Sequence, residues 1–312
     1  MGDYPRSILE LERRFATDDA CREYLVQLRW PDGFVCPRCQ STSSWLASRG
    51  RYICRACRHQ TSVTAGTIFE NTRKPLTLWF RAIWYVTSQK NGASAASLQQ
   101  ILGLRSYETA WIWLHKLRRA MIRPGREQLQ GVVEVDETYV GGEDPKDGSW
   151  VEQKAIVVIA AEEDGTGIGR IRMATVPKRT RKCLHRFIQE TIAVDSVVHT
   201  DGFHAYRGLD ALGYEHRQTI LLREKNKNAA SRLLPRVHRV ASLVKRWLLG
   251  THQGAVSAAH LDYYLDEFTF RFNRRTSRSR GKLFYRLLQQ AVQIAPTTYQ
   301  HMTRGKTPKH NM

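Results

Sequence analysis

The feature that most constrains this chain is a set of two Cys-x-x-Cys pairs, Cys36/Cys39 and Cys54/Cys57, with 14 residues between the pairs. In each pair two thiolates can approach one ion from the same turn, and two pairs complete a tetrahedral site that leaves no position for a substrate. The alternatives are two disulfides or a redox dithiol. A start without a signal sequence argues against disulfides, and a thioredoxin-like motif comes once, inside a βαβ unit. We therefore predict one structural Zn²⁺ ion held by all four cysteines.

The segment that holds these cysteines, residues 31–70, is interpreted as a zinc ribbon, because short β-like pieces link the two pairs. So short a segment depends on its metal for most of its stability. The isolated Cys21 and Cys183 are expected to be ordinary thiols, and His59 a bystander.

The charge balance indicates an anionic partner. The 312 residues include 49 Lys and Arg against 29 Asp and Glu, a formal net charge of +20. Nucleic acid is the first candidate, while a ribosome-associated or membrane-surface protein stays open on charge alone. No apolar run approaches 18 residues, so we expect no transmembrane helix. Charged residues stand where an apolar signal core would lie, so we expect a cytoplasmic protein.

Composition and hydrophobic periodicity divide the chain into five segments. They are an N-terminal helical segment (1–30), the zinc ribbon (31–70), a helix-turn-helix region (71–124), an α/β domain (125–275) and a basic C-terminal tail (276–312). From Arg274 onward the chain carries nine Lys and Arg and no Asp or Glu, which is typical of a solvated electrostatic arm.

The helix-turn-helix prediction rests on two helical patterns joined by a short turn at Gly103, with Ser94 and Ser106 as N-caps. The alternative is a pair of packed helices with a solvated basic face. In the second helix we expect three apolar residues to face the core: Trp111, Leu114 and Leu117. We expect three basic residues to reach DNA phosphates: Lys116, Arg118 and Arg119.

The α/β domain begins after the turn signal at residues 123–125 and is predicted to combine strands with helices. The expected strands lie in GVVEVDETYV, KAIVVIAA, GIGRIRMATV, DSVVHTDG and YEHRQTI, and the expected helices span about 180–193, 235–249 and 258–273.

Carboxylates in this domain suggest divalent-metal chemistry on a phosphate backbone, which needs acids that converge from separate elements. Glu134 and Asp136 share one face of an alternating strand, while Glu137 points the other way. Asp201 ends a strand 65 residues after Asp136. Strand ends of open α/β sheets are frequent ligand sites.

A basic helix after residue 235 adds His238 and Lys245, which are seven residues apart and share a helical face. Taken singly, each of these residues also has a non-functional interpretation. An aspartate can form a turn, a histidine can be a hydrogen-bonded polar residue, and a lysine can lie in solvent. Their combination beside two DNA-binding segments favours a functional site.

Over nearly the whole chain, the sequence resembles the bacterial insertion-sequence transposases of the ISXO-like group. The resemblance rests on CPRC with CRAC, and on SVTAGTIFENTRKPL, EVDETYVGG, HTDGFHAY, LPRVHRVASLVKRWLLGTHQG and HLDYYLDEFTFRFNRR. It implies an RNase H-like catalytic core of the DDE class, with a mixed sheet flanked by helices, and DNA cleavage at element ends with Mg²⁺.

Position by position, the resemblance implies that Asp136 is the first catalytic acid and Asp201 the second. The third position, a glutamate in the wider class, falls on His238, followed by Lys245. A neutral nitrogen ligand holds Mg²⁺ less well than a carboxylate and suits Mn²⁺ better. Glu267 is an alternative third acid, although its surroundings also fit a core-packing helix.

The resemblance further implies a pair of catalytic Mg²⁺ or Mn²⁺ ions, double-stranded DNA as the partner, and a homodimer or higher oligomer on that DNA. Lys245 and Arg246 are expected at the DNA backbone, in a bacterial protein associated with the nucleoid when bound. Two rival functions remain open, a catalytically inactive DNA-binding regulator and a nuclease without strand transfer.

Overall fold

The computed structural model describes residues 3–123, 125–141, 154–219, 233–254 and 256–303, and these divide into two compact units. Unit 1 contains residues up to 123 together with 277–306, and unit 2 contains residues 124–276. The sequence places segment boundaries at 124/125 and 275/276, within a residue of these divisions. Among the described residues no helix is long and apolar enough to cross a membrane.

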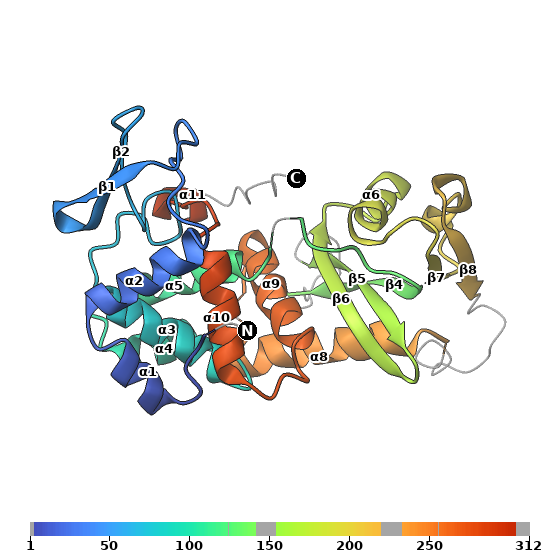
Figure 1. The fold of residues 1–312 in the computed structure, drawn as a ribbon. Helices are drawn as coiled ribbons and strands as arrows, with labels where there is room; N and C mark the ends of the chain where they lie inside the picture. Colours follow the sequence, from blue (N-terminus) through green and yellow to red (C-terminus); the bar gives the residue numbers. More distant parts are fainter. Residues whose placement is uncertain (1–2, 124, 142–153, 220–232, 255, 304–312) are drawn as a thin grey trace. The chain divides into compact units, whose positions relative to one another are not determined.

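Unit 1 is helical, with a small sheet inserted after its second helix (Figure 1). Its helices are α1 (Ile8–Arg14), α2 (Asp18–Arg29), α3 (Leu76–Ser88), α4 (Ala95–Leu102), α5 (Tyr107–Ala120), α10 (Arg280–Ala291) and α11 (Tyr299–Thr303). Its antiparallel sheet consists of β1 (Ser44–Ala47), β2 (Arg51–Cys54) and β3 (Gln60–Ser62).

Helices α4 and α5 lie where the sequence predicts a helix-turn-helix and are joined by a short turn at Gly103. The Ser94 side chain accepts a hydrogen bond from the main chain of Ser97, and Ser106 caps α5 in the same way, so both predicted N-caps are confirmed. Gly103 ends α4 with φ 60°, a left-handed conformation that glycine adopts without a Cβ penalty.

The buried face of α5 differs from the prediction in two places. Leu114 and Leu117 are buried as expected, but the buried tryptophan is Trp113, which stacks on Trp79, while Trp111 is half-buried. Arg118 is 1% exposed, because it follows Leu114 by one helical turn on the buried face. Its predicted reach to DNA phosphate is therefore wrong.

The C-terminal segment also differs from the prediction of a solvated arm. Residues 280–291 form α10, whose apolar face is buried in unit 1. Phe284 is fully buried, with its ring centroid 5.7 Å from that of Phe80 and 5.8 Å from that of Trp84. Counting basic residues missed this helix because its charges lie on one face and its apolar residues on the other.

Unit 2 is built on a five-stranded mixed sheet in the order β6-β5-β4-β7-β8. The first three strands are antiparallel and the last three parallel. Its elements are β4 (Val132–Val140), β5 (Ala155–Asp164), β6 (Gly167–Val176), α6 (Arg181–Thr191), β7 (Val197–Asp201), β8 (Glu215–Thr219), α8 (Pro235–His252) and α9 (Leu261–Phe272). This confirms the mixed sheet flanked by helices.

Helices cover both faces of this sheet, with α6 on one side and α8 on the other (Figure 1). One core joins Val157 and Ile159 of β5 to Val240 and Val244 of α8. The other core joins alternate residues of β4 and β5 to α6. The strands buried on both faces explain the continuous apolar run in β5.

Substitution Phe284→Ala tests whether α10 is part of the folded core of unit 1. We expect the free energy of unfolding to fall by about 3–5 kcal/mol, because a large buried ring leaves a cavity. The control Lys282→Ala removes a positive charge from an exposed position of the same helix and should change stability by less than about 0.5 kcal/mol. Equal effects of the two substitutions in urea unfolding would show that the helix contributes charge and not packing.

Candidate functional site

The two aspartates of the predicted site lie on neighbouring parallel strands. Strands β4 and β7 pair with Val132 opposite Val197 and Glu134 opposite His199. Continued by two residues, this register sets Asp136 opposite Asp201. Adjacent strands are about 4.8 Å apart, so the sheet brings together two carboxylates that are distant in sequence.

His238 approaches this pair from α8, which packs over the same face of the sheet. Its Nε2 lies 3.8 Å from Oδ2 of Asp136, and both side chains remain partly exposed, at 33% and 20%. Partial burial lowers the pKa of His238 below its usual 6.5, against the opposing charges of Glu134 and Asp201. The ring is therefore neutral at physiological pH, the form that can bind a metal ion.

Asp136 is the carboxylate of the site whose pKa is raised. Burial raises its pKa from an ordinary 3.8 to about 7, and the negative charges of Glu137 and Asp201 add to this shift. The main-chain N–H of Glu137, 2.8 Å from Oδ1, opposes it. A buried carboxylate beside two other acids is stabilised by a cation, so the donor set fits a divalent metal ion.

Lys245 and Arg246 lie two helical turns beyond His238, on an exposed stretch of α8. Partial desolvation and the nearby Lys154 lower the pKa of Lys245. Neighbouring positive charges of this kind favour an anionic ligand.

The alternative third acid, Glu267, is fully buried in α9, and its Oε1 accepts a 2.8 Å hydrogen bond from Nε of Arg271. It is thus paired one turn along its own helix, while His238 faces Asp136. This burial and pairing fit the core-packing helix that is the other interpretation of the segment around Glu267.

Two further carboxylates of β4 have structural partners that the sequence did not reveal. Glu137 points to the opposite face from Asp136, as expected, and there accepts a hydrogen bond from the Tyr206 hydroxyl at 2.5 Å and pairs with Arg179. Glu134 pairs with Arg236 at the start of α8. Alternation along the strand predicted the faces, but these partners come from distant segments.

On the helix-turn-helix, Lys116 and Arg119 are half-buried, and desolvation lowers the pKa of Lys116. Arg118 is buried and does not belong to a DNA-facing set.

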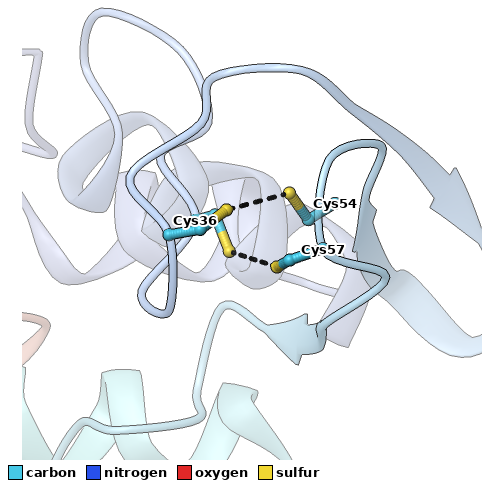
Figure 2. A group of neighbouring side chains, drawn as sticks. Cys36, Cys54 and Cys57 are labelled. Carbon is cyan, nitrogen blue, oxygen red and sulfur yellow. Dashed lines mark hydrogen bonds between the residues drawn. The ribbon is translucent and has the colours of Figure 1, made fainter.

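The four cysteines of the ribbon converge on one point. Figure 2 shows the labelled Cys36, Cys54 and Cys57 turned toward one another from two loops. The Sγ atoms of Cys36 and Cys57 are 3.7 Å apart, and those of Cys39 and Cys54 are 3.6 Å apart. Tetrahedral Zn–S bonds of about 2.3 Å place sulfur atoms about 3.8 Å apart, so the spacing fits one zinc ion.

Within the ribbon, the main-chain N–H of Cys57 lowers the pKa of Cys54 to about 6 and so favours its thiolate, whereas hydrogen bonds with the thiols of Cys57 and Cys54 raise the pKa of Cys39. The ligand atoms of the four cysteines all lie within 4.8 Å of one another. Among the described residues, no other group of three or more His, Cys, Asp or Glu side chains is this compact. Asp136, Asp201 and His238 do not come that close as a set of three.

Comparisons with protein families match two parts of the chain. Residues 128–273 match the model of the ISXO2-like transposase domain, and residues 16–60 match that of the transposase zinc-ribbon domain. Together these matches cover more than half of the chain. The chain therefore carries an ISXO2-like transposase domain preceded by a transposase zinc ribbon. The resemblance stated from its motifs is confirmed.

A relative of this transposase is an uncharacterised protein of the transposable element ISH50 from Halobacterium salinarum. It is 29% identical over 293 residues, which cover 86% of this chain and 95% of the relative. Among solved structures, the catalytic core domain of BIV integrase matches with a TM-score of 0.28 and 18% identity, over 44% of this chain and 81% of that one.

Substitution Cys54→Ser tests the metal site of the transposase ribbon. We expect the wild-type chain to bind one zinc ion and the variant to bind none and to lose the folded ribbon, because the metal supplies most of the stability of so short a segment. The isolated Cys183→Ser on α6 is the matched control and should keep one zinc per chain. Elemental analysis and thermal melting of both variants measure this, and full zinc content in Cys54→Ser would contradict the site.

The raised pKa of Asp136 predicts that the metal-free transposase becomes less stable as the pH rises. The folded chain holds this proton up to about pH 7, whereas the unfolded chain releases it near 3.8, so folding binds a proton throughout this window. The stability of wild type relative to Asp136→Asn should therefore fall by about 2–4 kcal/mol between pH 4 and pH 8. Urea unfolding with a chelator measures this difference, and a constant difference would contradict the pKa shift.

Proposed function

We propose that this transposase binds double-stranded DNA at the ends of its insertion sequence and catalyses metal-dependent strand cleavage and strand transfer. The observation that supports the proposal is His238 Nε2 at 3.8 Å from Oδ2 of Asp136, beside the parallel strand that ends in Asp201. Two carboxylates and one imidazole from separate elements form a donor set for divalent cations.

In this proposal Asp136, Asp201 and His238 hold Mg²⁺ or Mn²⁺, two ions in all. The bound ions supply Lewis-acid activation of the attacking oxygen and stabilisation of the leaving one. The imidazole favours Mn²⁺ over Mg²⁺ relative to a site with three carboxylates.

The chemistry consists of two in-line displacements at phosphorus. A water oxygen bonds to phosphorus as the bond to the 3′ oxygen breaks, which leaves a 3′-hydroxyl. That hydroxyl then bonds to a phosphorus of the target strand, whose own 3′ oxygen leaves with a proton. Lys245 neutralises a non-bridging phosphate oxygen, and Arg246 contacts the backbone beside it.

The remaining segments bind DNA and, in the ribbon, hold the structural zinc ion. The helix-turn-helix of α4 and α5 docks on the terminal repeats, with Lys116 and Arg119 toward phosphates. The zinc ion keeps the ribbon folded and takes no part in catalysis, because all four ligand positions are cysteines. Joining two element ends requires a dimer or higher oligomer on DNA. A chromosomal substrate places the protein at the nucleoid.

Cleavage and strand-transfer assays on end-containing DNA with Mg²⁺ or Mn²⁺ test this function. We expect Asp136→Asn and Asp201→Asn to lower both activities by at least a thousandfold, with little change in DNA affinity. His238→Ala should lower both activities and raise the metal concentration needed for half-maximal activity. Lys245→Ala should lower both activities roughly tenfold.

Three outcomes of these assays would count against the proposal. Activity that survives in Asp136→Asn excludes the metal site. Specific end binding without cleavage by the wild type identifies a DNA-binding regulator, and cleavage without joining identifies a nuclease. If Glu267→Gln loses activity while His238→Ala keeps full activity, Glu267 and not His238 is the third catalytic residue.

A further inference from the structure

Glu134 is a fully buried carboxylate that lies two residues before Asp136 on the same face of β4. Only 1% of its surface is exposed. The charge needs close partners at such a site, because an isolated buried carboxylate is strongly disfavoured. The structure provides these partners at the start of α8.

The contacts of Glu134 account for every open main-chain donor in the first turn of α8. Its Oε2 accepts hydrogen bonds from the main-chain N–H of Arg236 at 2.8 Å and of Val237 at 3.0 Å. Pro235 has no N–H to offer, and the N–H of His238 already bonds to the carbonyl of Leu234. The helix has no side-chain cap from its own N-cap residue, so a carboxylate from the sheet takes that role.

Arg236 extends the same connection to the β5–β6 hairpin. Its Nη1 donates to Oε1 of Glu134 at 2.9 Å, and its Nη2 lies 2.8 Å from Oε1 of Glu163. The guanidinium also donates to the carbonyl oxygens of Gly165 and Gly167, both at 2.9 Å. The first turn of α8 is thereby tied to β4 and to the neighbouring hairpin.

We infer that Glu134 and Arg236 form a clamp that positions His238 against Asp136. This inference rests on the proposed function of the site. His238 is the residue directly after the two capped N–H groups, and its Nε2 lies 3.8 Å from Oδ2 of Asp136. A shift of the first turn of α8 moves the imidazole relative to the aspartates. Glu134 is a positioning residue, because it acts through α8.

Substitution Glu134→Gln removes the charge and replaces one acceptor with an NH₂ group that faces donors. Glu162→Gln is the matched control. Glu162 is a buried carboxylate on β5 that also accepts from two main-chain N–H groups, of Gln130 at 2.9 Å and of Arg170 at 3.0 Å, and pairs with the Arg170 guanidinium at 2.6 Å. Both variants change a carboxylate with one arginine partner and two main-chain donors, although the Arg170 side chain is more exposed, at 36%, than that of Arg236, at 15%. Of the two acids, Glu134 is the one whose hydrogen bonds in the described structure reach α8.

The first readouts use the full chain without DNA. Hydrogen exchange at the amides of Arg236 and Val237 should accelerate at least tenfold in Glu134→Gln and stay unchanged in Glu162→Gln. Mn²⁺ binding, followed by calorimetry, should weaken about tenfold in Glu134→Gln alone. Equal exchange or equal Mn²⁺ affinity in the two variants overturns the inference.

The second readout is strand cleavage at a temperature where both variants are folded. We expect Glu134→Gln to lower kcat at least tenfold with KM and Kd for end DNA unchanged, and Glu134→Asp to recover part of the loss. A similar loss in Glu162→Gln, or a loss confined to Kd, overturns the positioning role. If the wild type binds Mn²⁺ but cleaves no DNA, the proposed function fails while hydrogen exchange and Mn²⁺ affinity still test the clamp.

Discussion

Buried and partly buried carboxylates on one central strand are the constraint on which unit 2 depends. Three of the four residues from Glu134 to Glu137 are acids, and each lies within the folded sheet. Glu134 is balanced by Arg236 and the start of α8, and Glu137 by Arg179 and Tyr206. Asp136 lies between them without a basic partner of this kind among the described residues, and burial raises its pKa to about 7.

The two balanced acids connect the strand to opposite layers of the domain. Glu137 ties β4 to the segment after β7 that follows Asp201, while Glu134 ties it to the helix that carries His238. Removing either acid leaves buried partners uncompensated, so stability and site geometry are linked in this strand.

Local signals predicted much of the architecture and part of the site. The N-caps Ser94 and Ser106 and the cysteine pairs can be recognised from residues close to them in sequence. The structure agrees with both predictions. Arg118 and α10 were misjudged, because charge alone does not reveal which face of a helix is buried.

The sequence by itself determined the ribbon chemistry, the alternation that sets Asp136 on the opposite face from Glu137, and the family. Only the tertiary structure decided which distant residues meet. Strand β7, which carries Asp201, pairs with β4, which carries Asp136, and α8 brings His238 to within 3.8 Å of Asp136. Strand pairing and helix docking join residues up to 100 or so positions apart, and no local pattern encodes those distances, because they depend on the packing of the whole domain.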